Sequence, residues 1–429
     1  MYKAGSLIYE IQKRPFLRPL IFWIAGIVLQ ICFPLQKISF VFLFIALTAL
    51  FLSFIFSKTL QRNDAKIYTT RCVWGVVFAC IVVFIAVQTT NLTEQRLSST
   101  QTPGVLYHKA QEMQSQMVGK LGLLHLPDED KAVLATLTVN YRKAMSSDMR
   151  KRFSVTGVSH LLAVSGFHVG IVSAFISVLL SFLSRKKVAS RWIQYLITLT
   201  CVWSFTYLSG LATAAVRAAV MITIYLTGRV SGRNPDKYNT LAGAAFCMLV
   251  YNPFYLFDVG FQLSFTAVFF ILYLQPRISR LIEIRNPLIA SPWNVITVTI
   301  AAQACTSFLC FFYFGQSSMV FLFTNLALSL LATLLIPVTL LWMIAPSSFP
   351  GIEIVRKSIE TMTRSFMWIV ERFASIPGAT MSVRFDFITL ILSYLFLAFI
   401  LQYCRSRRYW TLMVSLATLL VVICWQMIQ

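Results

Sequence analysis

Charged residues are scarce in this chain of 429 residues, at 12% of the total, and only 15 residues are Asp or Glu against 37 Lys and Arg. Water-soluble domains usually carry about 25% charged residues. Because 58% of the residues are hydrophobic and the mean hydropathy is +0.73, the sequence excludes a soluble globule and predicts an all-α polytopic membrane protein. The formal net charge of +22 must gather in loops and at helix ends, which suits basic cytoplasmic loops and also a passing polyanion.

Metal-binding and catalytic motifs are also missing. None of the nine cysteines forms a Cys-x-x-Cys pair or groups with histidine, so neither a disulfide framework nor a zinc site is indicated. Of the four histidines, His160 and His168 would lie about 12 Å apart along a helix, too far to share one ion. Ser165 lies between Val164 and Gly166 and not in the Gly-x-Ser-x-Gly of a nucleophile elbow. We therefore expect no catalytic residue, no metal and no cofactor.

Apolar segments of about 18 to 25 residues, long enough to cross a membrane as helices, recur along the chain. A shorter apolar piece at 239–251 ends at Asn252 and Pro253 and is too short to be a clear crossing. The other expected spans are 19–35, 38–57, 72–90, 161–183, 192–209, 211–229, 258–275, 293–314, 319–345, 386–403 and 409–428. This gives about 11 to 12 apolar helical segments, together with amphipathic helices at the membrane surface.

These segments suggest four regions. An N-terminal region with three spans (1–98) precedes amphipathic helices outside the cytoplasm (99–160), a membrane core (161–345), and an amphipathic helix with the last two spans (346–429). In the second region, Val133, Leu134, Leu137 and Tyr141 mark the apolar side of a surface helix.

Basic loops predict the orientation, because lysine and arginine concentrate on the cytoplasmic side. Two such loops place 91–160 outside; they carry Lys58, Arg62, Lys66 and Arg71, and Arg185, Lys186, Lys187 and Arg191. If every segment crossed, the cluster at Arg405, Arg407 and Arg408 would lie outside. One segment must then be re-entrant, either 239–257 or 319–345, which Pro337 interrupts. We favour 319–345, because that choice also keeps Arg277, Arg280 and Arg285 inside.

Two runs bring polar groups into apolar sequence, where such groups are expensive. The run Gly157–Gly170 holds two histidines, two serines and three glycines, and the run Asn252–Phe265 holds a carboxylate, amides and a hydroxyl. The spacing of Gly166 and Gly170 is typical of close helix packing, but the same segment would also suit a channel wall.

Arg217 lies among alanines within an expected span. It either forms an ion pair with Asp258, which locks two helices together, or faces a watery path where phosphates pass. Neutral polar groups in the spans would solvate such a path without trapping a chain, or would serve as hydrogen bonds between helices. The candidates for lining the path or contacting its cargo are His160, Ser165, His168, Arg217, Asp258, Gln262, Ser264, Gln303 and Asn325.

The ordered pieces resemble the ComEC family of competence proteins. They are Gly157–Gly170, Gly210 with Arg217–Met221, Gly228 with Arg229, and Asn252–Phe265. The resemblance implies an inner-membrane channel through which one strand of DNA enters the cytoplasm during natural transformation. Its partners would be single-stranded DNA, membrane lipid, and separate receptor, nuclease and motor proteins.

Two departures from the family pattern stand out. Only about 70 residues separate Asn91 from His160, too few for the external OB-like domain of many members. No His-x-His-x-Asp-His motif of a metallo-β-lactamase-like nuclease is present. The chain therefore resembles the membrane core alone. A small-solute transporter or permease is the alternative function, and an intramembrane enzyme using His160, Ser165 or His168 is a third.

The orientation predicts the behaviour of reporter fusions. A reporter that is active only outside the cytoplasm should work when fused near residue 110 and fail near residue 187, because basic residues crowd 185–191. The same reporter placed after Gln429 should be active, because one re-entrant segment changes the parity of crossings. Activity near residue 187 would contradict the orientation, and an inactive C-terminal fusion would contradict the re-entrant segment.

Overall fold

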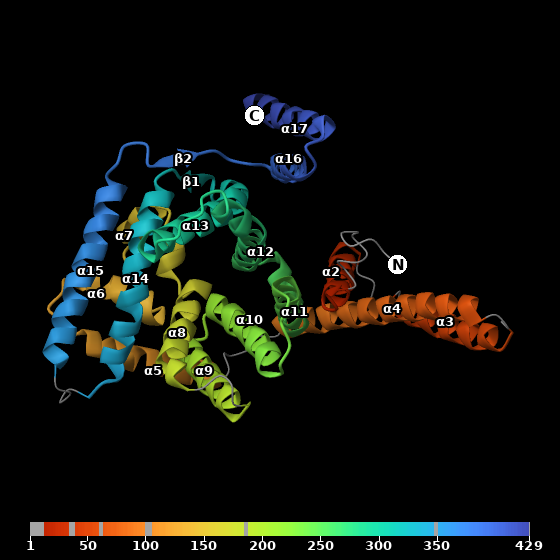
Figure 1. Ribbon diagram of the computed structural model, residues 1–429, viewed down its shortest axis with the longest axis horizontal. Coiled ribbons are helices and arrows are strands. Elements are labelled where there is room, and N and C mark those ends of the chain that lie inside the picture. The colour runs from red at the N-terminus through yellow and green to blue at the C-terminus, as the bar shows by residue number, and fades with distance from the viewer. Residues whose placement is uncertain are drawn as a thin grey trace. The chain divides into compact units, whose positions relative to one another are not determined.

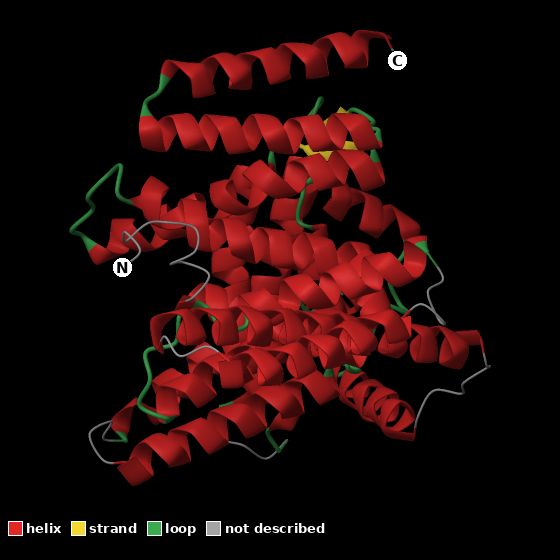
Figure 2. Ribbon diagram, turned by 90° about the vertical axis from the view of Figure 1, so that its right-hand side faces the viewer, coloured by secondary structure: helices red, strands yellow, loops and turns green. Residues whose placement is uncertain are grey.

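The computed structural model describes residues 13–33, 39–59, 63–98, 105–183, 188–346 and 351–428, and it is almost entirely helical, as Figure 2 shows. The chain divides into two compact units. The first comprises Met1–Val105 and Val220–Gln262, and the second comprises Leu106–Ala219 and Leu263–Gln429. Two helices, α10 (Thr213–Val230) and α12 (Val259–Ser279), contain boundaries between the units. The four-region division expected from sequence stays a prediction.

The first unit is built from α2 (Leu17–Cys32), α3 (Ser39–Thr59), α4 (Asn63–Ser98), α11 (Lys237–Tyr251) and the 3-10 turn η3 (Pro253–Phe257). Helix α2 packs on α4 and α11. Gly26 permits close approach to α4, since a Cβ there would lie 2.7 Å from the Cβ of Ala86. Trp23 fixes α2 to α11: its indole N–H donates to the Leu249 carbonyl at 3.2 Å, and its ring meets Phe246 edge to face at 5.3 Å.

The second unit contains the main hydrophobic core. It lies among α5 (Val105–Leu121), α6 (Asp128–Val139), α7 (Ser147–Val155), α14 (Phe321–Ile344) and α15 (Ile352–Ala374). Sequence periodicity predicts a surface helix with one apolar side at α6, and this is wrong in one respect. Every residue from Ala132 to Val139 is buried, because α6 has neighbours on several sides, among them α14 and α15.

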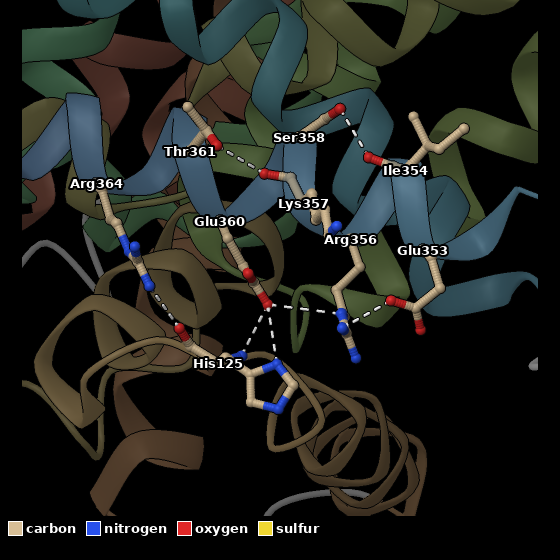
Figure 3. A network of polar contacts seen from close by, with 9 residues as sticks. All are labelled: His125, Glu353, Ile354, Arg356, Lys357, Ser358, Glu360, Thr361 and Arg364. Carbon is tan, nitrogen blue, oxygen red and sulfur yellow. Dashed lines mark hydrogen bonds and ion pairs between the residues drawn. The ribbon is translucent and has the colours of Figure 1, made fainter.

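Helix α15 confirms the amphipathic helix expected before the last two spans, within 346–429. Its buried side presents Ile359, Phe366 and Val370 to the core, next to α14 (Figure 1). Figure 3 shows how polar contacts hold it to the turn between α5 and α6. The backbone N–H of His125 donates to Glu360 Oε1 at 2.8 Å, and Arg364 donates to the His125 carbonyl at 2.9 Å. These bonds fix the turn and α15 in one register.

The remaining elements of the second unit are mostly apolar helices. They are α8 (Gly166–Leu179) with the 3-10 turns η1 (Ser159–Leu162) and η2 (Leu180–Phe182), α9 (Val188–Leu208), α13 (Pro287–Phe314), α16 (Phe387–Ser406) and α17 (Tyr409–Ile428). Two short strands, β1 (Gln316–Ser318) and β2 (Thr380–Ser382), pair antiparallel. Tyr394 ties α16 to α13 by donating its hydroxyl to the Cys305 carbonyl at 2.9 Å.

Seven helices in the described part of the chain are long and apolar enough to cross a membrane. They cover Val73–Arg96, Thr213–Val230, Val259–Ser279, Ile289–Phe314, Phe321–Ile344, Phe387–Ser406 and Tyr409–Met427. All seven coincide with spans expected from sequence, so the chain is an all-α polytopic membrane protein. Four other expected spans fall short of this measure: α9, which carries Arg191 and Gln194, and the shorter apolar helices Leu17–Cys32, Phe40–Phe51 and Gly166–Phe182.

Helix α14 continues through Pro337, so the interruption expected there is absent. That 319–345 is the re-entrant segment stays a prediction without this support. The basic loops that predict the orientation lie largely outside the part of the chain that the structure describes. The residues whose position or side chain is not described are Lys58, Arg62, Lys66, Arg71, Arg185, Lys186 and Lys187.

The start of α8 corrects the geometry expected for the first polar run. His160 and His168 do not share a helix, because His160 lies in η1 and residues Ala163 to Ser165 are extended before α8 begins at Gly166. Gly157 turns the chain into this segment with φ +76°, a conformation that L side chains rarely adopt. A Cβ on Gly157 would lie 2.7 Å from the Cβ atoms of Phe321 and Ser318. The close packing of α8 expected from sequence involves Gly166, which faces Ala218, whereas a Cβ on Gly170 would meet nothing within 4 Å.

Replacing Gly157 should therefore be far more damaging than replacing Gly170. Gly157→Ala should lower the free energy of unfolding by about 2 kcal/mol or more, from the left-handed backbone together with the two close contacts. Gly170→Ala is the matched control, and it should be neutral or stabilising by up to about 1 kcal/mol, because it lies inside a helix with open space around it. Melting temperature in detergent and membrane abundance measure both changes. Equal melting temperatures for the two variants would contradict the packing at Gly157.

Candidate functional site

The first polar run forms a capped helix start. Ser165 is the N-cap of α8, and its hydroxyl oxygen accepts the Phe167 N–H at 3.3 Å. The Ser165 N–H in turn donates to His168 Nδ1 at 3.2 Å, so that the serine and the histidine form a capping box. In apolar surroundings the free N–H groups of a helix start need such protein partners. Two candidate site residues therefore serve the backbone.

The capping box fixes the tautomer of His168. Because a backbone N–H can only donate, Nδ1 accepts, and the neutral ring carries its proton on Nε2. The side chain is fully buried, yet Nε2 has no hydrogen-bond partner in the part of the chain that the structure describes. The Ser165 hydroxyl lies 3.0 Å from Nδ1, which is the reach of a nucleophile and its base. Since Nδ1 already accepts the backbone N–H, however, the arrangement favours capping over catalysis.

The second polar run also consists of helix starts, all within the first unit. Asn252 accepts the Phe254 N–H at 3.0 Å and begins η3 with Pro253 in its first turn. Asp258 accepts the Phe261 N–H at 2.7 Å at the start of α12. The amide of Gln262 donates to the Leu256 carbonyl at 3.0 Å and closes the turn. Asp258 and Gln262, two of the candidates for lining the path, therefore stabilise the backbone at a helix start.

Arg217 lies in the second turn of α10 and its side chain is buried, with 5% of its surface exposed. It belongs to the second unit, whereas Asp258 belongs to the first, so the ion pair between them stays a prediction. Ser264 lies on α12 and is half-buried.

Two groups of polar contacts lie one helical turn apart along α13 in the second unit, and we call them together the polar track. His160 lies next to Asn325 on α14, and the Asn325 amide donates to the Thr299 hydroxyl on α13 at 2.6 Å. One turn along α13, Gln303 donates to the Ser317 hydroxyl on β1 at 3.1 Å. Next to Ser317, Gln316 donates to the Ser154 hydroxyl on α7 at 3.1 Å. The polar track comprises Ser154, Gln316, Ser317, Gln303, Thr299, Asn325 and His160.

The polar track carries no carboxylate, lysine or arginine. Gln316 and His160 are exposed, and Gln303 and Asn325 are half-buried on helices that could cross a membrane. The ring of His168 lies within electrostatic reach of His160, which links the capped start of α8 to the track. Amides, hydroxyls and an imidazole of this kind offer both donors and acceptors to a polar cargo. Among the described residues, no three side chains of His, Cys, Asp or Glu come together in a way that could hold a metal ion.

The structure brings together three of the nine candidates, His160, Gln303 and Asn325, with His168 close by. Sequence reasoning missed Thr299, Ser154 and the strand residues. A signal for Thr299 was present, because it lies four residues before Gln303 on the same helix face. No sequence signal connects Ser154 with Gln316, which lie 162 residues apart.

Comparisons with known proteins agree with this picture. A model of the family described as "Competence protein" matches residues 137–408, more than half of the chain. ComE operon protein 3 of Bacillus subtilis (strain 168) is 30% identical over 202 residues, which cover 46% of this chain and 24% of that protein. An uncharacterized protein, YcaI, of Escherichia coli (strain K12) is 24% identical over 163 residues, 36% of this chain and 21% of that protein.

The chain thus spans under a quarter of the length of these curated relatives. No solved structure matches. The family match includes both polar runs in full, together with α13, α14 and β1, which carry most of the polar track. The chain belongs to the family of ComEC-type competence proteins.

Proposed function

We propose that this chain forms an inner-membrane channel for single-stranded DNA during natural transformation, with no catalytic residue of its own. The polar track is the observation that carries the proposal. It links neutral donors and acceptors on two helices of spanning length, α13 and α14, with exposed residues at Gln316 and His160. A conducting path must solvate its cargo at several sites without holding it at any one of them.

The unsatisfied donor of His168 supports the proposal. A buried N–H group without a partner costs about 1–3 kcal/mol, so the position is expensive as pure packing. Water or a cargo acceptor in the channel would satisfy Nε2. With 37 basic residues against 15 acidic residues, the protein would also attract a polyanion toward the membrane surface.

The proposal extends to partners and place. A channel without catalytic residues needs other proteins to deliver DNA, to remove the second strand and to pull the first. We therefore assign the chain separate receptor, nuclease and motor partners, membrane lipid as its surroundings and the plasma membrane as its location. A small-solute permease is the alternative, and the uptake experiment below separates it from a DNA channel.

Deletion of the gene should abolish entry of labelled DNA into the cytoplasm of its host and leave DNA binding at the cell surface intact. Within the restored protein, Gln303→Leu and Asn325→Leu should each lower uptake by about tenfold or more at normal abundance, because apolar side chains interrupt the polar track. Gln402→Leu, the same change at an exposed position on α16, is the control and should leave uptake unchanged.

Two results would count against the channel. Normal entry of labelled DNA in the deletion strain would reject DNA uptake and favour the permease. Uptake that falls only in proportion to protein abundance in the Gln303 and Asn325 variants would reduce the polar track to hydrogen bonds between helices.

Arg217 provides a separate test of phosphate contact. If Arg217 meets phosphates, Arg217→Gln should lose most uptake at normal abundance, and Arg217→Lys should keep part of it, because a point charge suffices. Asp258→Asn, which keeps the N-cap of α12 but removes the charge, should then be neutral.

An ion pair between the two residues gives the opposite pattern. Asp258→Asn should lower abundance, because it would leave the buried guanidinium of Arg217 without compensation, at a cost of about 3–5 kcal/mol, whereas Arg217→Gln leaves only the exposed carboxylate of Asp258. The double variant Arg217→Gln with Asp258→Asn should restore both abundance and uptake. Such recovery would reject phosphate contact at Arg217.

A further inference from the structure

A cationic pair lies near one end of the polar track, and no carboxylate among the residues that the structure describes lies close enough to neutralise it. Arg142, in the loop between α6 and α7, and Arg150, on α7, are both exposed to solvent. The guanidinium of Arg150 donates to the Arg142 carbonyl at 3.3 Å, which brings the two residues together. Within the described ranges, neither arginine has a carboxylate within ion-pairing distance.

Neighbouring basic residues differ in this respect. Arg152 pairs with Asp148 at 2.7 Å and lies 3.5 Å from Glu371, and Lys131 pairs with Asp128 at 3.6 Å. Partial burial and, after it, the charge of Arg150 lower the pKa of Arg142. Surroundings that disfavour a further cation favour an anion. The acidic residues of this region thus neutralise other cations and leave Arg142 and Arg150 uncompensated.

The loop that carries Arg142 is held in one conformation. Asn140 ends α6 in the left-handed conformation, and its side-chain oxygen accepts from Arg142 Nε at 3.2 Å and from the Val164 N–H at 3.3 Å. The Thr136 hydroxyl lies 2.8 Å from the Tyr141 carbonyl and 2.7 Å from the Ala132 carbonyl and shares its proton between them. Through Asn140, Arg142 is therefore connected to the residue that directly precedes Ser165. Because the loop is already ordered, it would lose little further conformational entropy when a ligand binds.

Arg150 is connected to the polar track through α7. Arg150 and Ser154 are four residues apart on this helix and share one face, about 6 Å apart along its axis. Ser154 is the end of the polar track, where it accepts the Gln316 amide at 3.1 Å. Arg150 therefore lies one helical turn from the hydroxyl at the end of the track, and Arg142 lies next to Arg150.

We propose that Arg142 and Arg150 bind a backbone phosphate of the DNA strand at the mouth of the polar track. The inference rests on the proposed function, and it adds a binding site and the group bound there. Guanidinium groups present forked donors that match phosphate oxygens, and an anion between two of them relieves their mutual repulsion. The site is sequence-independent because every nucleotide carries the same phosphate.

Nucleic acid fits this pair better than a lipid headgroup does. Both contain phosphate, but the pair is attached to two features of the proposed path, Val164 before the start of α8 and Ser154 at the end of the track. A lipid headgroup would need no such connection. Binding of anionic lipid is accordingly an outcome that the experiment can report.

The test measures binding of a fluorescent 30-nucleotide single strand to the purified full chain in nanodiscs of zwitterionic lipid. Arg142→Gln with Arg150→Gln should weaken binding about tenfold, as expected for two contacts between opposite charges at a surface. It should also reduce the slope of log affinity against log salt by about 0.7, because one phosphate contact to a single strand contributes about that amount.

Two further double variants control this result. Lys131→Gln with Arg152→Gln removes the same charge from residues that already have carboxylate partners, and it should change both quantities much less. Arg142→Lys with Arg150→Lys keeps the charge and should keep the salt slope. Equal losses in the two glutamine pairs would overturn the proposal in favour of net charge alone, and an equal loss in the lysine pair would reduce the arginines to a structural role.

Unchanged DNA affinity in the first glutamine pair would also overturn the proposal. If that variant retains less co-purified phosphatidylglycerol as well, the pair is a lipid site. If the proposed channel function is wrong, a different result is expected: DNA enters cells that lack the gene at the normal rate. In that case binding in nanodiscs still decides whether Arg142 and Arg150 form a phosphate site.

Discussion

The structure depends on one constraint, that a helix which begins in apolar surroundings must find protein partners for its first backbone N–H groups. Ser165 with His168 meets this constraint for α8, Asn252 for η3 and Asp258 for α12. The same constraint explains why polar residues cluster in two runs at the edges of apolar segments. It also separates two kinds of polar residue: those whose side chains hydrogen-bond to the backbone at a helix start, and those whose side chains remain available to contact a cargo. By this measure the second run is chiefly architecture, whereas the polar track is the better candidate for transport.

Hydropathy and periodicity predicted the parts of this fold that depend on local sequence. All seven helices of spanning length and the amphipathic α15 were predictable, because length and apolar pattern suffice for them. The site was predictable only in part. His160, Gln303 and Asn325 were recognisable as polar groups in or beside apolar segments, but their connection through Thr299 depends on how α13 crosses α14. Such tertiary contacts leave no trace in the spacing of one chain.

Two expectations failed for physical reasons that generalise. His160 and His168 were placed on one helix because the run looks apolar, yet Gly157 and the extended residues before Ser165 interrupt it. Helix α6 was read as a surface helix because its composition is mixed. Its threonines are buried nonetheless, since Thr136 and Thr138 return their hydroxyls to backbone carbonyls one turn earlier. A hydroxyl that is satisfied within its own helix costs little on burial, so threonine does not mark a solvent-facing side.

The arrangement of charge suits passage of a polyanion. Arg150 lies one helical turn from the track with Arg142 beside it, where the two arginines would raise the local concentration of phosphates, while the track itself carries no fixed charge. The reverse arrangement would be worse. A guanidinium within the apolar core would hold a phosphate strongly, because attraction between charges grows as the surroundings become less polar. Strong attraction is therefore best kept where water screens it, and neutral donors and acceptors are best placed where release must be fast. This division of roles between Arg142 with Arg150 and the polar track follows from electrostatics alone.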